Sequence, residues 1–288
     1  MNSIQNSLSK NTNSAVAEVA SMIRSHSKDH KILIVVEGPS DCKVFRKMYD
    51  ANDFDVYNSI HYTGCLHFKD ILDGCNKKYK SRFLIIKDAD FDNLNQIHYD
   101  KYPNLFLTDT HDLETLMLNY SFVPNNFNPI CPFNNKNFVL SVMGDIIHLS
   151  VIKWYNEIYK LNLNFKNTCK VGRCYKGNCS ITISDWLNAI AQEPQNSMKK
   201  IPTENDILTF EHSPKNCVQN YMQITNGHDL IDGMTIKHHY NINENLKKDS
   251  VYQEIENNFD ENFYMNTTLC FNINKWLIQI KSNTKCIP

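Results

Sequence analysis

Carboxylate side chains gather at three places in the first 120 residues, and each group follows a hydrophobic stretch. The groups are Glu37 with Asp41, Asp88 with Asp90 and Asp92, and Asp109 with Asp112 and Glu114. Carboxylates that lie close together repel one another unless some are protonated or a cation neutralises them. Oxygen ligands suit Mg²⁺ or Mn²⁺, which commonly combine one or two carboxylates with a substrate phosphate. The pattern therefore predicts a divalent-metal site, if the fold brings the groups together.

The elements that must position these acids are short hydrophobic runs, as in strands buried on both faces. We expect strands at 31–36, 54–62, 82–87 and 105–107, and helices at 16–23, 41–49, 68–79 and 112–120. This order predicts an α/β fold with a mostly parallel sheet flanked by helices. Ligands of such sheets bind outside the carboxyl ends of the strands, where all three acidic groups fall.

The second half of the chain is expected to be mainly helical. Its amphipathic stretches predict helices at 138–161, 184–192, 214–224, 250–259 and 271–280. A Pro- and Asn-rich segment at 124–135 predicts a domain boundary. The expected parts are a helix within 1–30, a catalytic α/β domain over 31–123 and a helical domain over 135–288, of which 225–280 is a candidate to pack back on the catalytic core. The long helix at 138–161 suggests a homodimer.

Each acid also has a simpler interpretation as a helix cap, and for any single residue that interpretation is favoured. Three groups at successive strand ends are harder to explain as caps alone. Motifs of other enzyme classes are missing from the sequence, including G-x-G-x-x-G, G-x-x-x-x-G-K-[ST], G-x-S-x-G and H-E-x-x-H. The sequence therefore gives no support to a dinucleotide-binding, P-loop, serine-hydrolase or zinc-protease assignment.

Charge is distributed unevenly along the 288 residues, although 30 Lys and Arg nearly balance 31 Asp and Glu. Seven acids and three bases lie between 82 and 114, whereas five bases and no acid lie between 160 and 181. Phe165 and Tyr175 are interleaved with these bases. Lysine and arginine that follow a phosphate backbone, with aromatic rings that stack on bases, are typical of nucleic-acid contact. The expected contacts are Lys166, Lys170, Arg173, Tyr175 and Lys176; the alternative is a solvated loop.

The compartment expected from the sequence is the cytoplasm. No stretch of about 18 apolar residues predicts a membrane span, and the first residues have no apolar core of a secretory signal. The ten cysteines are then expected to be reduced thiols. Cys169, Cys174 and Cys179 have a spacing looser than most zinc sites, so zinc there is the less favoured alternative, with His148 or His212 as the fourth ligand.

Two of the acidic segments also resemble a known family. Val36-Glu-Gly-Pro-Ser-Asp41 and Ile86-Lys-Asp-Ala-Asp-Phe-Asp92, each after a hydrophobic strand, look like the Glu and D-x-D-x-D motifs of TOPRIM domains, which occur in topoisomerases, primases and OLD-family nucleases. Thr108-Asp-Thr-His-Asp-Leu-Glu114 and Asn226-Gly-His-Asp-Leu230 resemble two further motifs of the DUF4435 family. That family includes the nuclease subunit of PARIS-type anti-phage systems. The strongest likeness covers 31–120, with a weaker one over 225–280, and the cysteines at 169–179 have no counterpart in it.

The resemblance implies a role for each matching residue. It assigns the metal to six carboxylates: Glu37, Asp41, Asp88, Asp90, Asp92 and Glu114. Asp88 and Asp90 would hold the cation, Glu37 would be a ligand or a general acid and base, and the other three would support or complete the site. Lys69, Lys87 or His228 would face the phosphate, with His228 preferred. This constellation is coherent for phosphodiester hydrolysis with Mg²⁺ or Mn²⁺.

The function that the resemblance implies is a Mg²⁺-dependent endonuclease that acts as the toxic effector of an anti-phage system. Its substrate would be RNA in preference to DNA, with tRNA a candidate, and an ABC-type or AAA ATPase partner would control it. The alternatives are an OLD-like DNA-nicking nuclease, a catalytically silent regulatory subunit with a TOPRIM fold, and a phosphate-ester enzyme that acts on a small nucleotide.

Overall fold

The computed structural model describes residues 17–25, 31–58, 65–120, 133, 135–216, 218, 220–243 and 246–284. Within them the chain forms two compact units. The sheet unit comprises the described residues up to Asp88, together with His98–Thr108 and the residues from Asp260 onward. The helical unit comprises Ala89–Ile97 and Asp109–Phe259. The chain therefore crosses between the units within the D-x-D-x-D segment, and the proline-rich boundary expected at 124–135 lies mostly outside the described residues.

The sheet unit contains four parallel strands in the order β2-β1-β3-β4. Their bounds are Ile32–Val36 (β1), Phe54–Asn58 (β2), Phe83–Lys87 (β3) and Leu105–Leu107 (β4). The register pairs Ile34 with Val56 and with Leu84, and Ile86 with Phe106. All five residues of β3 are buried, as expected of a strand covered on both faces. The expected α/β class with a parallel sheet is confirmed.

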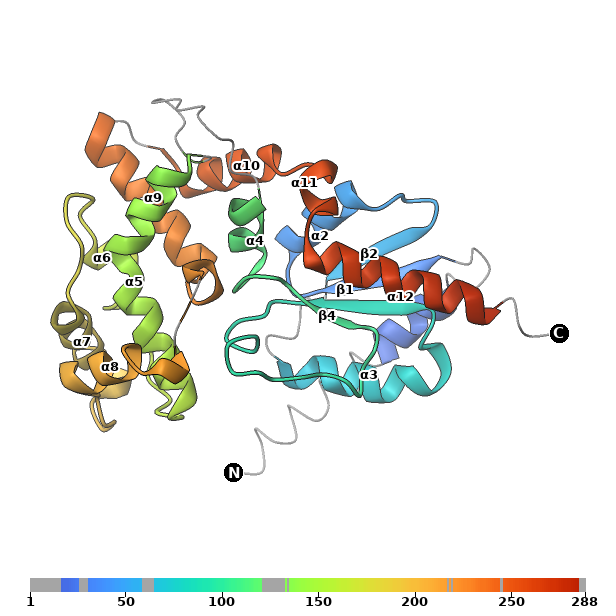
Figure 1. Ribbon diagram of the computed structural model, residues 1–288, viewed down its shortest axis with the longest axis horizontal. Coiled ribbons are helices and arrows are strands. Elements are labelled where there is room, and N and C mark those ends of the chain that lie inside the picture. The colour runs from blue at the N-terminus through green and yellow to red at the C-terminus, as the bar shows by residue number, and fades with distance from the viewer. Residues whose placement is uncertain are drawn as a thin grey trace. The chain divides into compact units, whose positions relative to one another are not determined.

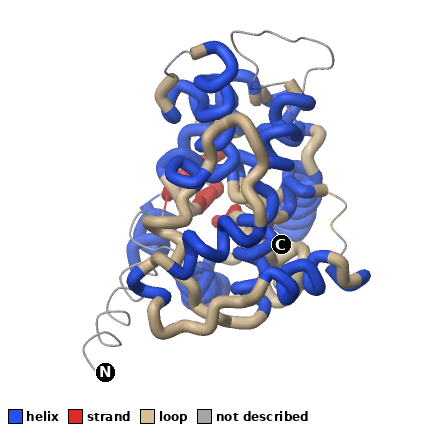
Figure 2. The backbone as a smooth tube through the Cα atoms, turned by 90° about the vertical axis from the view of Figure 1, so that its left-hand side faces the viewer, coloured by secondary structure: helices blue, strands red, loops and turns tan. Residues whose placement is uncertain are grey.

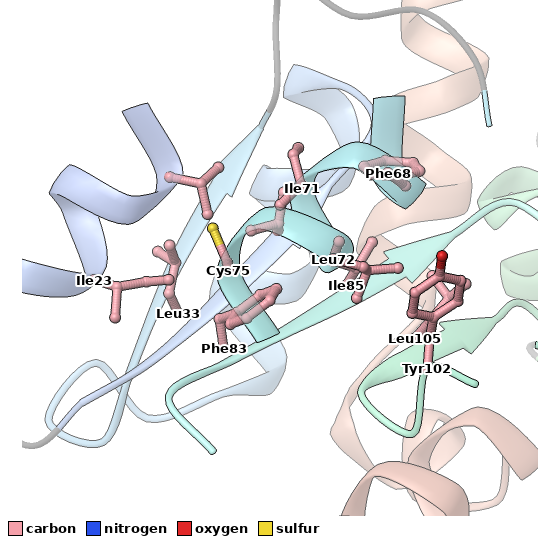
Figure 3. Packing of buried hydrophobic residues seen from close by; sticks show 12 residues of the cluster. Ile23, Leu33, Phe68, Ile71, Leu72, Cys75, Phe83, Ile85, Tyr102 and Leu105 are labelled. Atoms are coloured by element: carbon pink, nitrogen blue, oxygen red, sulfur yellow. The ribbon is translucent and has the colours of Figure 1, made fainter. Parts of the chain in front are cut away.

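One face of this sheet packs on helix α3 (Cys65–Tyr79) and on the helical residues 17–25. Alternate strand residues point to the same face, and Leu33, Val35, Phe83 and Ile85 share one cluster. Side chains of α3, including Ile71, fill the space against them (Figure 3). This cluster is the core of the sheet unit on that face.

The other face is covered by α2 (Pro39–Met48), α11 (Glu261–Met265) and α12 (Thr268–Thr284), on the side opposite to α3 (Figure 1). The hydroxyl groups of Tyr49 and Tyr264 are 2.5 Å apart and share a hydrogen bond. The rings of Phe106 on β4 and Trp276 on α12 meet edge to face, with centroids 6.2 Å apart. Residues 260–284 therefore return to the sheet, from about 170 residues further along the chain than β3.

The helical unit is built around the long helix α5 (Lys136–Ile158), which packs against α7, α8 and α9. The other helices are α4 (Leu113–Tyr120), α6 (Val171–Cys174), α7 (Ile183–Ala191), α8 (Glu204–Glu211), α9 (Gly227–Ile242) and α10 (Lys248–Asn258), which are labelled in Figure 1; Figure 2 draws all helices in blue. By length and composition α5 is the one helix, among the residues described, that meets the criteria for a membrane span. More than half of its most apolar window is buried inside the unit, which is the environment of a core helix.

Some expected elements are wrong or differ in extent. No helix spans 214–224: the structure has 3₁₀ turns at Pro214–Asn216 and Tyr221–Gln223 instead. Helices α8 and α9 were not expected at all. The strand expected at 54–62 is observed over Phe54–Asn58, and residues 59–64 lie outside the described part. The homodimer stays a prediction; helix α5, which suggested it, packs against α7, α8 and α9 of its own unit.

Candidate functional site

The predicted site residues divide between the units. Glu37, Asp41, Lys69, Lys87 and Asp88 belong to the sheet unit. The remaining ones belong to the helical unit: Asp90, Asp92, Glu114, Lys166, Lys170, Arg173, Tyr175, Lys176 and His228.

Glu37 and Asp88 lie at the carboxyl ends of the adjacent parallel strands β1 and β3. The Asp88 backbone N–H donates to Glu37 Oε1 at 3.1 Å, and both residues are half-buried. The parallel pairing of β1 with β3 causes this proximity, because it brings together two strand ends that are 51 residues apart. The sheet unit thus brings the Glu37 carboxylate to the backbone of Asp88, at the end of the neighbouring strand.

Lys87 is the last residue of β3 and is only 1% exposed. Its ammonium Nζ donates to the Asp88 carbonyl oxygen at 2.5 Å. A buried ammonium is costly unless it is hydrogen-bonded and charge-balanced. Lys87 is therefore a buried cation next to the acidic strand end, and the expectation that it contacts nucleic acid directly is wrong.

Asp41 serves as a helix cap in α2. Its Oδ2 accepts from the Gly38 N–H at 2.9 Å, and its Oδ1 accepts from Ser40 Oγ at 3.3 Å. Pro39 begins the helix, where its missing N–H costs nothing. Both Asp41 oxygens accept hydrogen bonds within the turn, so the cap interpretation accounts for this residue, and its metal role stays a prediction from the resemblance.

In the helical unit, Asp90 begins a compact turn that holds Asp92 in its interior. Asp90 has a backbone φ of 47°, in the left-handed region, where aspartate is better tolerated than most residues. The Asp92 N–H donates to Ala89 O at 2.7 Å, and Asp92 O accepts from the Ile97 N–H at 2.9 Å. Asp92 is 8% exposed, whereas the side chain of Asp90 is 54% exposed. Of these two acids, Asp90 is the one that presents its carboxylate to solvent.

The Asp112 side chain links the start of α4 to the start of α9 through hydrogen bonds. Its Oδ1 accepts from the Thr115 N–H at 3.0 Å, and its Oδ2 accepts from the Gly227 N–H at 2.6 Å. Asp109 is likewise engaged, because its Oδ2 accepts from Tyr120 Oη at 2.7 Å. Asp109 and Asp112, two of the three acids of the third group, are therefore parts of the scaffold of the unit.

Glu114 and His228 lie beside this junction. Glu114 is 4% exposed and its Oε1 is 3.9 Å from His228 Nδ1, whose side chain is 64% exposed. His228 follows Gly227 in the first turn of α9, which Asn226 caps through the Asp229 N–H. The structure therefore brings together Glu114 and His228, which lie in two segments far apart in the sequence.

No described group of three or more His, Cys, Asp and Glu side chains is arranged to hold a metal ion. The donors within the sheet unit nevertheless fit Mg²⁺, because Glu37 and Asp88 are half-buried oxygen ligands at neighbouring strand ends. One or two carboxylates are the usual protein contribution to a Mg²⁺ that also binds substrate phosphate. The site would be completed by substrate and water, and it is not a closed protein cage.

The predicted basic contacts differ in exposure. Lys166, Lys170, Arg173 and Lys176, here called the basic segment, are all exposed. Lys69 is exposed too, with its ammonium 5.7 Å from the centre of the Tyr99 ring. Tyr175 is 1% exposed and donates its hydroxyl to Asp145. Its ring is core and is unavailable for stacking on a base, so that expectation is wrong.

The cysteines of the 169–179 segment do not converge. Cys169 Sγ lies 3.8 Å from Asn164 O, and Cys174 Sγ lies 3.4 Å from Thr168 O. Burial raises the pKa of Cys169 to about 11, so this thiol stays protonated at neutral pH. None of these thiols belongs to a described group of side chains arranged to hold a metal ion, so the structure favours separate thiols.

No protein-family model and no curated protein sequence matches this chain. The site must therefore be interpreted from its own residues and geometry.

Two residues that the sequence reasoning did not single out organise the site. His111 holds the backbone of Asp90, and Gly227 provides the close approach between α9 and α4. Both lie within the motif segments already noted, at 108–114 and 226–230. Their spacing gave no signal, because their role depends on contacts between residues distant in sequence.

Proposed function

We propose that this protein is a Mg²⁺-dependent phosphodiesterase of the TOPRIM type that cleaves nucleic acid. The observation that carries the proposal is the contact between Glu37 and Asp88 at the ends of the adjacent parallel strands β1 and β3. The four motifs in their order along the chain add support from the sequence. Asp90 joins the proposed ligands on the sequence resemblance, and on its exposed carboxylate.

In this proposal Glu37 and Asp88 hold the cation. When bound, Mg²⁺ lowers the pKa of water and stabilises negative charge on phosphate oxygens. The protein's own contribution is to fix the carboxylates at rigid strand ends, where Glu37 also orients the attacking water or takes its proton. Lys87, buried with its ammonium at the Asp88 carbonyl oxygen, adds a positive charge next to this strand end, which favours the charged form of nearby carboxylates.

The basic segment supplies the proposed grip on the substrate. Its four cations are exposed and not balanced by acids within 160–181. Contacts between such side chains and phosphates are independent of base sequence and weaken as salt is added. The sequence resemblance alone gives His228 its proposed role as a cation that faces phosphate; within the helical unit its side chain is exposed beside the buried Glu114.

The biological setting of the proposal comes from the resemblance alone. It is a cytoplasmic toxic effector of anti-phage defence, which cleaves RNA in preference to DNA and is held inactive by an ABC-type ATPase partner.

A direct test incubates the full-length protein with end-labelled RNA and with DNA, single- and double-stranded. Parallel reactions contain Mg²⁺, Mn²⁺ or EDTA. The proposal predicts cleavage with either metal, none with EDTA, and faster cleavage of RNA. A small-nucleotide enzyme would instead hydrolyse free nucleotides and leave the polymers intact, whereas faster cleavage of DNA would favour the OLD-like alternative.

One observation favours the second candidate, a catalytically silent regulatory subunit. The described residues hold no preformed group of three metal-ligating side chains. A silent subunit would not bind Mn²⁺, and Asp88→Asn would raise its melting temperature simply by removing a repelling charge. Isothermal titration with Mn²⁺ on wild type and Asp88→Asn separates the two candidates, because the nuclease predicts binding that this substitution weakens.

A further inference from the structure

The backbone of Asp90 is held in an unfavourable conformation. At φ 47°, an L-residue brings its Cβ close to the following carbonyl oxygen, so the turn persists only where neighbouring contacts impose it. Residues 89–97 form four backbone hydrogen bonds among themselves: Asp92 N–H to Ala89 O, Asn95 N–H to Phe91 O, Gln96 N–H to Asn93 O and Ile97 N–H to Asp92 O. None of them uses the Asp90 N–H or the Asp90 carbonyl oxygen.

His111 bonds both polar groups of the Asp90 backbone. The Asp90 N–H donates to His111 O at 2.7 Å, and the His111 Nδ1 lies 2.8 Å from Asp90 O. A carbonyl oxygen can only accept, so Nδ1 carries the hydrogen of this bond. His111, which is 21 positions further along the chain, thereby closes a ring of two hydrogen bonds with the Asp90 backbone.

His111 is itself rigidly placed. It is 4% exposed, and its own N–H donates to Met222 O at 2.9 Å. Its ring packs edge to face against Phe91, with centroids 4.9 Å apart. Its Nε2 is 4.0 Å from Asp90 Oδ1. A buried ring with a fixed backbone can hold its partner in one orientation, as outer residues do for metal ligands.

We infer that His111 is a positioning residue that sets the direction of the Asp90 carboxylate through the Asp90 backbone. This inference rests on the proposed function for its link to catalysis, because that function makes Asp90 a metal ligand. The hydrogen bond from Nδ1 is the feature that does the positioning; the packing of the ring on Phe91 is a separate contribution to stability. Asparagine at 111 can place an amide N–H where Nδ1 lies, whereas leucine keeps more of the ring's volume and has no donor.

The two variants therefore separate positioning from packing. Hydrogen exchange of the peptide 88–97 is measured on metal-free wild type, His111→Leu and His111→Asn, together with thermal melting. Cleavage at saturating Mg²⁺ is measured on the same three proteins. We expect His111→Leu to exchange about five- to tenfold faster in 88–97 and to cleave about tenfold more slowly, and His111→Asn to stay within about threefold of wild type in both. For the melting temperature we expect the opposite ranking of the two variants: His111→Leu should lie closer to wild type than His111→Asn.

The inference is overturned if His111→Leu exchanges like wild type in 88–97, or if His111→Asn is as impaired as His111→Leu. If His111→Leu does not fold, His111→Gln is used in its place. The amide nitrogen of glutamine lies one bond further from the backbone than that of asparagine. If wild type cleaves no nucleic acid, the proposed function fails, while the exchange comparison still decides whether the His111 side chain holds the Asp90 turn.

Discussion

The backbone N–H of Gly227 donates a 2.6 Å hydrogen bond to Asp112 Oδ2, across 115 positions of sequence. The contact joins the first turn of α9 to the residue that precedes α4. A Cβ at 227 would lie 2.4 Å from Glu114 Cβ and 2.6 Å from Asp112 Oδ1. Only glycine allows this approach, and the approach is what brings His228 to Glu114.

Gly227→Ala should therefore destabilise the protein by about 3 kcal/mol, because two well-packed segments must move apart. The matched control is Gly144→Ala in α5, where an added Cβ meets nothing within 4 Å. That substitution should stabilise the fold by about 0.5–1 kcal/mol, since alanine favours a helix. Urea unfolding of both variants measures the difference. Equal effects at the two positions would contradict the close approach.

Asp90→Asn and Asp90→Ala should differ in stability while losing the same carboxylate. Asparagine tolerates a left-handed backbone as aspartate does, whereas alanine adds about 1 kcal/mol of strain at φ 47°. Calorimetry should thus place the melting temperature of Asp90→Ala below that of Asp90→Asn. The proposed function predicts that the two variants are equally impaired in cleavage. If the Asp90→Ala and Asp90→Asn variants melt at the same temperature, the left-handed backbone at residue 90 does not destabilise the native state.

The strands β1 and β3 could be predicted from sequence because they are hydrophobic runs that end in turns. The order of acids after Val36 and Lys87 then places Glu37 and Asp88 at one edge, as the structure has them. The role of Asp41 could not be fixed this way, since the same spacing serves a cap and a metal ligand.

The helices of the helical unit are harder to predict, because the faces that they bury contain both polar and apolar residues. A capping box, Thr203 with Asp206, marks the start of helix α8, so the sequence does contain a local signal for this helix. Helix α9 has a polar sequence and is held by packing on α5, which periodicity alone does not show. Tyr175 illustrates the opposite error: its basic neighbours suggested an exposed ring, whereas its hydroxyl pairs with Asp145 in the interior.

Glu193 should make stability depend on pH in the acidic range. Hydrogen bonds from the Asn167 side chain and the Thr168 backbone lower the pKa of this buried carboxyl. A lowered folded-state pKa contributes stability that is present above the unfolded value of about 4.3 and is lost as pH falls through the folded pKa. Glu193→Gln should therefore be less stable than wild type at pH 7, and the gap should shrink below about pH 4. Thermal melting from pH 7 to 3 checks this; a gap independent of pH would contradict it.

The basic segment should govern the salt dependence of nucleic-acid binding. Replacing Arg173 and Lys176 by glutamine should weaken binding and reduce the slope of log affinity against log salt by about 0.7 for each lost contact with a single strand. The control removes two exposed cations from α2, with Lys43→Gln and Lys47→Gln, at the same change of net charge. Filter binding between 50 and 300 mM salt, a range of about sixfold, distinguishes them. Equal slopes for the two double variants would show that only net charge matters.

The central claim is that Glu37 and Asp88 are essential for metal-dependent cleavage of nucleic acid. The most direct test is the rate of Mg²⁺-dependent cleavage by the variants Glu37→Gln and Asp88→Asn. Both substitutions keep the size and the acceptor oxygen of the side chain but remove its charge, so the 3.1 Å contact with the Asp88 backbone can survive in Glu37→Gln. We predict a loss of at least about a hundredfold in each variant, with hydrogen-exchange protection of the sheet unchanged. Cleavage that persists at the wild-type rate in both variants would contradict the assignment of the site.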